Sequence, residues 1–314
     1  MSHPKYAFQN GKVVPWEDAT VHVFSPAAKY GAGVFEGIRG YWNPDKEDMY
    51  LFKMEPHLER LMFSQKVMDF ETVYDPEYFT KGTLELIRAN DIRETVHIRT
   101  IVHIEGPGES SARGPVGTAI TVVPRPLPKR VTTGCTAQVS SWMRSPDTST
   151  PMRVKCNANY NNGRLAALQA TRDGYDTAIL LNQKGQVSEG PGMCFFMVRD
   201  GVPVTPSVTN DILESVTRKT VLEICEEYFG VKPVERDIDR SELYAAEEAF
   251  FCGTGWEICP INSIDKLPVG TGKPGEFTCK LRDTYFRIVK GEVNDHADWR
   301  MPVYGGNKAK AAAE

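Results

Sequence analysis

The sequence predicts an α+β fold divided into two domains, and three observations support this prediction. The chain has 314 residues, and a single hydrophobic core tends to split beyond roughly 250 to 300 residues. Patterns typical of strands alternate with patterns typical of amphipathic helices. Between the two predicted domains, residues 124–130 include three prolines at alternate positions. This spacing favours an extended connection over helix or sheet.

The proline-rich segment sets the predicted domain limits. Residues 1–124 are expected to form a small α+β domain, and residues 125–132 a semi-rigid linker. Residues 133–304 are expected to form a larger domain. The tail, residues 305–314, carries a run of Lys and Ala and is predicted to be disordered.

In the first domain, the pattern begins with a hairpin. Asn10-Gly11 separates short β-prone runs within residues 8–24, which is a strong hairpin signal. A helix is expected to begin at Pro56, since proline suits the first helical turn. Its apolar side chains fall largely on one side: Leu58, Leu61, Met62, Val67 and Met68. A helix over residues 77–90 and strands over residues 95–104 and 118–123 should follow.

In the second domain, short β-type runs alternate with two helices. The strands are predicted over residues 137–142, 177–181, 194–198 and 249–252. The helices are predicted over residues 160–172 and 217–228. In the second helix, Val221, Ile224, Cys225 and Tyr228 have the spacing of a buried face.

The composition excludes several classes of function. With 41% hydrophobic residues, 25% charged residues and a net charge of −4, nothing marks a nucleic-acid partner. The chain has no run of 18 apolar residues and no signal-peptide pattern at its start, so neither a membrane span nor secretion is predicted. The seven cysteines and six histidines are scattered, so we expect reduced thiols in a cytoplasmic protein and no bound metal.

Lys155, Tyr160 and Glu189 indicate the chemistry. A lysine, a tyrosine five positions later and a glutamate before Gly190 are the groups needed to hold a pyridoxal ring. The amine would form a Schiff base, the phenol would bind the ring oxygen, and the carboxylate would pair with the protonated pyridine nitrogen. The plainer interpretations are a surface lysine, a core tyrosine and a turn glutamate. The first hypothesis is a pyridoxal 5′-phosphate enzyme.

Donors for a cofactor phosphate are also present. Residues 213–218 head an amphipathic helix, whose first amides and hydroxyls can bind an anion. Thr254 offers a hydroxyl on a glycine turn, and Arg60 offers a guanidinium. Each feature has a plainer interpretation, as a helix cap, a loop threonine or a surface arginine.

Several ordered motifs resemble class IV aminotransferases, which are fold type IV pyridoxal phosphate enzymes, and most closely the branched-chain aminotransferases. The resemblance extends from about residue 8 to about residue 289. The matching runs are YGAGVFEGIR at 30–39, HLERL at 57–61, KCNANY at 155–160, GYD at 174–176, SEG at 188–190, VTR at 216–218 and GT at 253–254.

This resemblance implies roles for single residues. Lys155 would be the Schiff-base lysine, Glu189 the pyridine partner and Tyr160 the ring-oxygen partner. The implied phosphate contacts are Arg60, Val216, Thr217 and Thr254. The implied substrate-binding residues are Tyr30, Phe35, Gly37, Arg39, His97, Arg99, Thr254 and Gly255. The resemblance also implies a small α+β domain, a larger pseudo-barrel domain, and a homodimer or higher homo-oligomer that completes the substrate pocket.

The chain departs from the branched-chain pattern at four places. His97 stands where a tyrosine is usual, so a phenol that helps hold the α-carboxylate becomes an imidazole. Cys194 replaces an asparagine, and Glu214-Ser215 replaces a Pro-Gly pair. Gly255-Trp256 replaces an alanine and a small or polar residue.

The implied reaction exchanges the amino group of a branched-chain or other apolar L-amino acid with 2-oxoglutarate, in two half-reactions. Apolar Phe35 beside Arg39 and Arg99 fits a pocket that accepts apolar and carboxylate side chains alternately. The alternatives are an (R)-selective amine or D-amino acid transaminase, a lyase acting on an aminochorismate, and a non-catalytic protein of the same fold.

Overall fold

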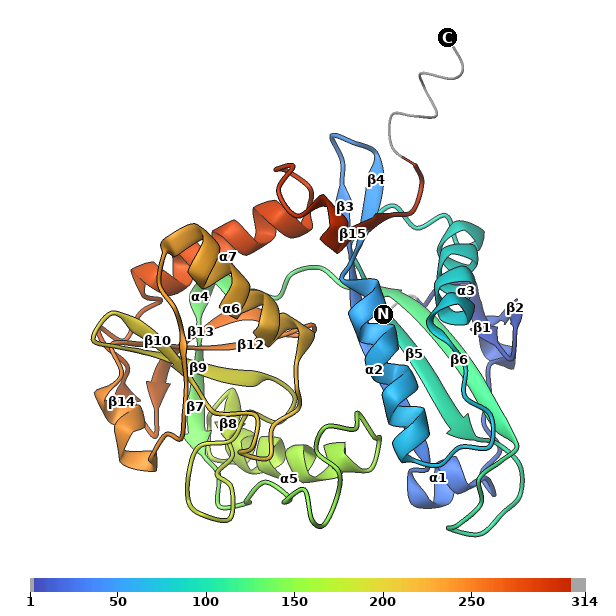
Figure 1. Ribbon diagram of the computed structural model, residues 1–314, viewed down its shortest axis with the longest axis horizontal. Coiled ribbons are helices and arrows are strands. Elements are labelled where there is room, and N and C mark those ends of the chain that lie inside the picture. The colour runs from blue at the N-terminus through green and yellow to red at the C-terminus, as the bar shows by residue number, and fades with distance from the viewer. Residues whose placement is uncertain (1–2, 306–314) are drawn as a thin grey trace. The chain divides into compact units, whose positions relative to one another are not determined.

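The computed structural model describes residues 3–305 of the chain. By their contacts these residues form two compact units (Figure 1). The first unit comprises residues 3–126, 154–158 and 287–305, and the second comprises residues 127–153 and 159–286. Each unit combines one large sheet with helices. The predicted α+β class is therefore confirmed.

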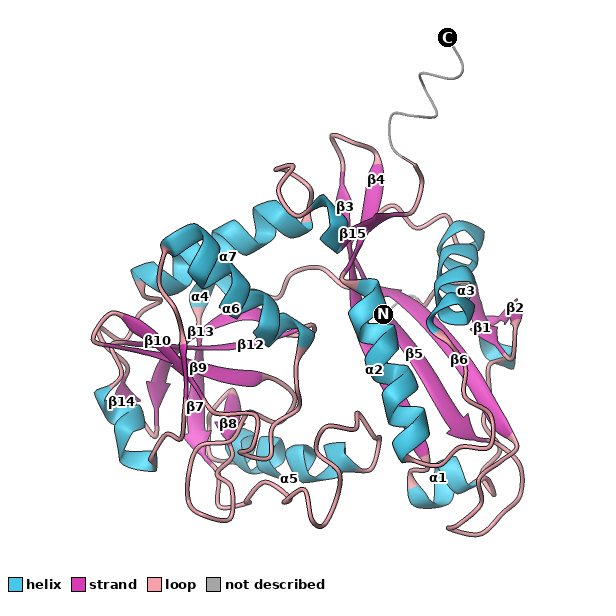
Figure 2. Cartoon of the chain, viewed as in Figure 1, coloured by secondary structure: helices cyan, strands magenta, loops and turns pink. Residues whose placement is uncertain are grey.

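The first unit contains a seven-stranded sheet with the order β15-β4-β3-β5-β6-β1-β2 (Figure 2). The strands are β1 Tyr6–Gln9, β2 Lys12–Pro15, β3 Gly33–Asn43, β4 Asp48–Phe52, β5 Val96–Ile104, β6 Val116–Pro124 and β15 Arg300–Pro302. Strands β1 and β2 pair around Asn10-Gly11, as predicted. After them comes the short 3-10 helix η1, Trp16–Asp18, instead of further strand.

Three helices belong to this sheet: α1 Pro26–Tyr30, α2 Met54–Val67 and α3 Pro76–Ala89. Helix α2 contacts β3, and α3 contacts β6. Leu58 and Leu61 of α2 are buried in the core, as the apolar pattern predicted. Val67 is 45% exposed, however, and the helix buries the polar side chains of Ser64 and His57. The buried face of α2 is therefore partly polar.

The second unit contains an eight-stranded sheet with the order β11-β10-β9-β12-β13-β7-β8, and β14 pairs with β13. The strands are β7 Cys135–Val139, β8 Thr177–Ile179, β9 Cys194–Arg199, β10 Val202–Thr205, β11 Val234–Glu235, β12 Glu248–Gly253, β13 Glu257–Ile264 and β14 Leu267–Pro268. The helices are α4 Arg130–Thr133, α5 Asn159–Arg172, α6 Val216–Phe229 and the 3-10 helix η2 Arg240–Ala245. The chain passes into the first unit within α7, Glu276–Val289, and continues through η3, Ala297–Trp299.

Two segments lie in the first unit although the predicted limits placed them in the second domain. Residues 154–158 join it because Val34 forms an antiparallel bridge with Cys156. Residues 287–304 join it because β15 pairs with β4. In both segments, hydrogen bonds satisfy backbone polar groups by pairing with β3 or β4. A pattern of apolar residues in the sequence does not reveal this backbone pairing.

The remaining expectations concern the ends of the chain and the membrane. Apart from Gly305, the predicted tail lies outside the described residues. Within residues 3–305, no helix is both long and apolar enough to cross a bilayer.

Candidate active site

Strands β3 and β5 place five of the predicted substrate residues on one face of the first sheet. Antiparallel pairing sets Gly37 opposite Arg99, and Arg39 opposite His97. Side chains alternate between the two faces of a strand. Phe35, two positions before Gly37, therefore points to the same face as these four residues.

On this face, positively charged side chains surround the aromatic ring of Phe35. The Arg99 guanidinium carbon lies 4.6 Å from the Phe35 ring centroid, and Lys155 Nζ lies 5.0 Å from it. Arg39 is 3% exposed, and its Nη1 donates to the Arg125 carbonyl at 2.9 Å. An apolar ring among cations can receive either an apolar group or a carboxylate.

His97 lies over Gly37 on this face. A Cβ atom at Gly37 would lie 3.1 Å from His97 Nε2, so the missing side chain leaves room for the imidazole. Burial first, and then the positive charges of Arg99 and Arg125, lower the pKa of His97 to about 3. The imidazole is therefore neutral at neutral pH and offers hydrogen bonds without charge.

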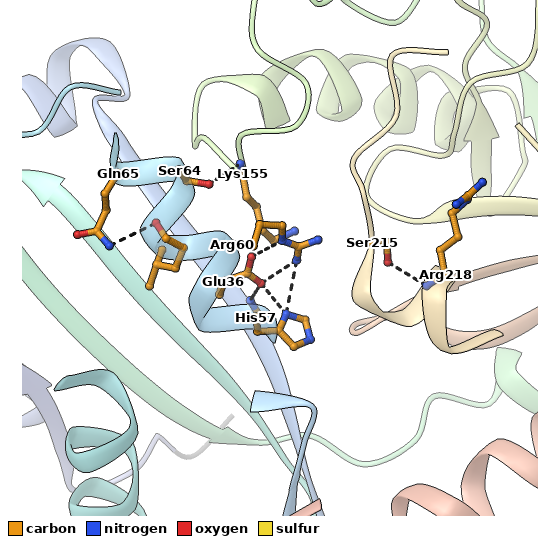
Figure 3. Close-up of polar contacts among 10 residues, drawn as sticks. Glu36, His57, Arg60, Ser64, Gln65, Lys155, Ser215 and Arg218 are labelled. Carbon is orange, nitrogen blue, oxygen red and sulfur yellow. Dashed lines mark hydrogen bonds and ion pairs between the residues drawn. The ribbon is translucent and has the colours of Figure 1, made fainter. Parts of the chain in front are cut away.

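Lys155 lies on a short extended segment beside β3. The amide of Phe35 donates to the Lys155 carbonyl at 3.0 Å. The amide of Lys155 donates to Ser64 Oγ of α2 at 3.3 Å (Figure 3). Together with the bridge between Val34 and Cys156, these bonds hold the backbone from which the amine extends.

Arg60 contacts a buried carboxylate, Glu36, that the sequence analysis missed. Glu36 Oε1 accepts from Arg60 Nε at 2.6 Å, and Oε2 accepts from Arg60 Nη2 at 2.9 Å (Figure 3). His57 Nδ1 lies 2.7 Å from Oε2. The glutamate is visible in the motif around residue 36, but a sequence does not show which side chains face a buried carboxylate.

The protonation of this cluster follows from its burial and charges. Burial alone would raise the pKa of Glu36, but Arg60 and His57 together hold it well below its ordinary value. Burial lowers the pKa of His57, despite the opposing effect of Glu36. The cluster at neutral pH is therefore a carboxylate, a neutral imidazole and a guanidinium.

In the second unit, Tyr160 and Glu189 belong to one packed region. Tyr160 lies in the first turn of α5. A Cβ atom on Gly192 would lie 3.5 Å from Tyr160 Cε1, and one on Gly163 would lie 2.3 Å from the Pro191 carbonyl oxygen. Helix α5 thus packs directly on the loop that follows Glu189.

Glu189 forms an ion pair with Arg144, a second residue that the sequence analysis missed. Arg144 Nη2 lies 2.5 Å from Glu189 Oε1, and both side chains are more than nine-tenths buried. The amide of Leu213 donates to Oε2 at 3.3 Å, and Cys194 Sγ lies 3.9 Å from the same oxygen. The positive charge offsets the unfavourable burial of a lone carboxylate. No spacing in the sequence signals this pair.

Val216 and Thr217 form the first turn of α6. Ser215 caps the helix, because its Oγ accepts from the Arg218 amide at 3.3 Å. Amides in a first turn precede any intrahelical acceptor, so this helix start can bind an anion. The Arg218 guanidinium instead donates to the Pro206 carbonyl at 2.9 Å.

Thr254 and Gly255 lie in the tight turn between β12 and β13. Arg130 Nη2 donates to the Gly255 carbonyl at 3.4 Å, and the Arg130 guanidinium carbon lies 4.1 Å from the Trp256 ring centroid. The Trp256 amide donates to the Gly253 carbonyl at 3.0 Å. These contacts fix the shape of a turn whose sequence departs from the branched-chain pattern.

Tyr30 ends α1 and is 46% exposed. Its hydroxyl donates to Glu109 Oε2 at 3.4 Å. The predicted site residues therefore fall in two groups, one in each unit. The first unit holds Tyr30, Phe35, Gly37, Arg39, Arg60, His97, Arg99 and Lys155, and the second holds Tyr160, Glu189, Val216, Thr217, Thr254 and Gly255. Among residues 3–305, no cluster of His, Cys, Asp and Glu could hold a metal ion.

Comparisons with known proteins give a consistent result. The family described as amino-transferase class IV matches residues 33–264. A protein from Aquifex aeolicus named probable branched-chain-amino-acid aminotransferase is 37% identical over 301 residues, covering 95% of this chain and 97% of that protein. The crystal structure of the branched-chain aminotransferase from Thermoproteus uzoniensis with norvaline has a TM-score of 0.91 and 40% identity, covering 96% of this chain and 100% of that one. The PLP form of the branched-chain amino acid aminotransferase from Thermobaculum terrenum has a TM-score of 0.90 and 39% identity, covering 96% and 99%.

Proposed function

Because this chain belongs to the class IV aminotransferase family, we propose that it transfers the amino group of branched-chain L-amino acids to 2-oxoglutarate, with pyridoxal 5′-phosphate as its cofactor. One observation carries the proposal. The amine of Lys155 lies 5.0 Å from the ring centroid of Phe35, on a sheet face that also presents Arg99. A lysine amine beside an apolar ring and a cation suits amino acids with apolar or carboxylate side chains.

The residues present fit pyridoxal 5′-phosphate. Glu189, already ionically paired, offers a buried carboxylate for the ring nitrogen. Tyr160 offers a phenol for the ring oxygen. Arg60 and the first amides of α6 offer donors for the phosphate. Lys155 supplies the amine to which such a cofactor attaches.

When bound, the cofactor withdraws electrons from the substrate α-carbon. Lys155 Nζ would take the proton from the α-carbon of the amino acid in the first half-reaction and would deliver a proton to the α-carbon formed from the oxo acid in the second. Its backbone bonds to Phe35 and Ser64 fix the point on the chain from which the amine extends. A fixed backbone limits the positions that the amine can reach, so less orientation must be gained in the transition state.

The sheet face suits two different substrates in turn. Phe35 can receive the side chain of leucine, isoleucine or valine, and Arg99 can receive the second carboxylate of glutamate or 2-oxoglutarate. Neutral His97 can donate a hydrogen bond to the substrate or accept one from it. Because the imidazole is uncharged, it does not compete with the guanidinium for the negative charge of the substrate. The same pocket can therefore serve both half-reactions.

The test is an absorbance titration of the cofactor-loaded protein with L-leucine in the absence of any oxo acid. The proposal expects the band of the lysine-bound cofactor to be replaced by that of pyridoxamine 5′-phosphate. D-leucine and (R)-1-phenylethylamine serve as controls and should leave the band unchanged. A band that shifts only with these controls would favour the alternative function, an (R)-selective amine or D-amino acid transaminase.

A substitution separates the chemistry from simple binding. Lys155→Ala should lose turnover by at least about a thousandfold, since no other base replaces its amine. The variant should still bind the cofactor, which equilibrium dialysis can measure. Turnover within about tenfold of the parent protein would rule out the role proposed for Lys155.

We further propose that the protein acts as a homodimer or larger homo-oligomer in the cytoplasm. Apolar side chains are exposed near the start of α1: Val21 at 46%, Val23 at 81% and Phe24 at 54%. Neighbouring exposed apolar side chains often mark an interface. Light scattering should report a multiple of the 35.1 kDa chain mass, and cell fractionation tests the compartment. A single-chain mass would contradict the assembly.

A further inference from the structure

The cluster of Glu36, His57 and Arg60 is not explained by packing alone. Glu36 is fully buried and His57 is 2% exposed. Burying charged groups is unfavourable, and apolar side chains of similar volume often stabilise a fold as well or better. Buried ionic groups of this kind commonly support a functional side chain by fixing its orientation.

The hydrogen bonds of Glu36 define the plane of the Arg60 guanidinium. Two oxygens of Glu36 meet two nitrogens of Arg60, at 2.6 and 2.9 Å. A bidentate pair restricts rotation about the long arginine side chain, which otherwise has several freely rotating bonds. The amide of Gly37 also donates to Glu36 Oε2 at 3.2 Å, so the carboxylate is itself held in place.

His57 supports Glu36 with a hydrogen bond and without a charge. In the neutral state its Nδ1 carries a proton and donates to Oε2 at 2.7 Å. A charged imidazole here would repel Arg60, whose Nη2 lies 3.5 Å from Nδ1. The cluster therefore carries no net charge, and Arg60 gains a fixed orientation but a weaker long-range attraction for anions.

Helix α2 links this cluster to Lys155. Arg60 and Ser64 are four residues apart and so lie on one side of the helix (Figure 3). Ser64 accepts from the Lys155 amide, and Phe35, next to Glu36, donates to the Lys155 carbonyl. The same two elements, α2 and β3, thus hold both the guanidinium and the lysine backbone.

We propose that Glu36, assisted by neutral His57, is a positioning residue that orients the Arg60 guanidinium toward the cofactor phosphate. The inference rests on the proposed function, because that function assigns the phosphate to Arg60. The competing explanation is that Glu36 merely neutralises a buried arginine. The two explanations predict opposite effects, since removing a negative charge strengthens phosphate binding whereas losing the orientation weakens it.

The experiment compares binding of two probes, pyridoxal 5′-phosphate and pyridoxal, which differ only in the phosphate. Dissociation constants are measured by equilibrium dialysis for the full chain and for Glu36→Gln. In this variant an NH2 group replaces one carboxylate oxygen and faces the N–H donors of Arg60 and His57. Because two donors cannot form a hydrogen bond with each other, the guanidinium should be displaced. We expect the preference for the phosphorylated probe to fall about tenfold. The affinity for pyridoxal should change less than about threefold.

Two further variants sharpen the test, and one of them, Glu36→Asp, keeps it decisive if Glu36→Gln folds poorly. Glu36→Asp keeps the charge but shortens the reach, so it should reduce the phosphate preference to an intermediate value. In the double variant E36Q/R60A, the first substitution should add no loss beyond Arg60→Ala alone. Ile38→Val is the matched control: it lies on the same face of β3 and is buried, and it should leave the preference unchanged.

Three results would overturn the inference. One is an equal loss of affinity for both probes, which indicates a general structural role. The second is tighter binding of the phosphorylated probe, which indicates charge neutralisation. The third is an additional loss in the double variant. Failure of the proposed function is a separate outcome, because the parent protein would then bind neither probe or would not respond to L-leucine.

Discussion

His97 shows how neighbouring charges determine the state of a single residue. The imidazole lies over Gly37 and near Arg39, Arg99 and Arg125. Its sequence position identified it as a substitution for the usual tyrosine but left its charge open. Burial and the surrounding cations decide the matter, because a protonated ring here would be both desolvated and repelled.

This arrangement predicts a dependence of stability on pH. The pKa of His97 is lowered to about 3 in the folded chain, compared with about 6.5 in an unfolded one. As the pH falls below about 6.5, the unfolded chain takes up a proton that the folded chain does not, so stability decreases toward pH 3. Between pH 7 and 5.5 the loss from His97 should be about 1 kcal/mol.

Urea unfolding of the parent chain and of His97→Gln checks this expectation. Glutamine does not titrate, so the difference in unfolding free energy between the two proteins isolates His97 from His57 and His103, whose pKa values are also lowered. Parallel pH profiles for the two proteins would refute the prediction.

The catalytic residues and their partners differ in how far the sequence reveals them. Lys155, Tyr160 and Glu189 were predicted from residue type and spacing, and their roles remain predictions. Glu36 and Arg144 were missed. Their importance lies in contacts with residues distant in the chain, and a sequence pattern reports residue types but not such contacts.

At the scale of the elements, helix α5 packs closely against the loop after Glu189 at one glycine, Gly163. A Cβ atom on Gly163 would lie 2.3 Å from the Pro191 carbonyl oxygen, closer than any tolerated contact. Backbone cannot rotate away as a side chain can. Gly163 therefore sets the distance between the helix that carries Tyr160 and the loop that carries Glu189.

Gly163→Ala should destabilise the protein by about 1–3 kcal/mol through this overlap, even though alanine favours the helix. It should also shift the absorbance of bound cofactor, because the Tyr160 and Glu189 contacts move. The matched control is Gly192→Ala, whose Cβ would lie 3.5 Å from Tyr160 Cε1 at ordinary contact distance. Equal effects of the two substitutions on urea unfolding would contradict the explanation.

Strand β3 is one of several elements that the sequence analysis did not predict. It contains five residues with weak strand preference: Gly33, Glu36, Gly37, Gly40 and Asn43. It is also buried along nearly its whole length, so it lacks the alternation that identifies a half-exposed strand. By contrast, the hairpin at Asn10-Gly11 and helices α3, α5 and α6 have clear local signals, and they are confirmed.

At the scale of the whole molecule, the first unit is assembled from three separate stretches of chain. Residues 287–305 return to it and add β15 at the edge of the sheet. Val303 is fully buried in its core, and Arg88 donates to the Val303 carbonyl at 2.7 Å. The end of the chain is therefore part of the unit that carries Lys155.

A chain that stops at residue 286 should lose this edge strand and the buried Val303. We expect a loss of more than about 3 kcal/mol in unfolding free energy, with weaker cofactor binding. A chain that stops at residue 305 keeps every described contact and is the control. Similar thermal unfolding of the two shortened chains would show that the last strand contributes little.

The sequence by itself determined the α+β class, the hairpin, most helices and the family, since these depend on local periodicity, turn chemistry and ordered motifs. The tertiary structure alone decided that Lys155 belongs to the first unit, that Glu36 clamps Arg60, that Arg144 pairs with Glu189 and that His97 is neutral. The physical reason is that burial and electrostatic pairing depend on which distant segments meet, and only the folded chain brings those segments together.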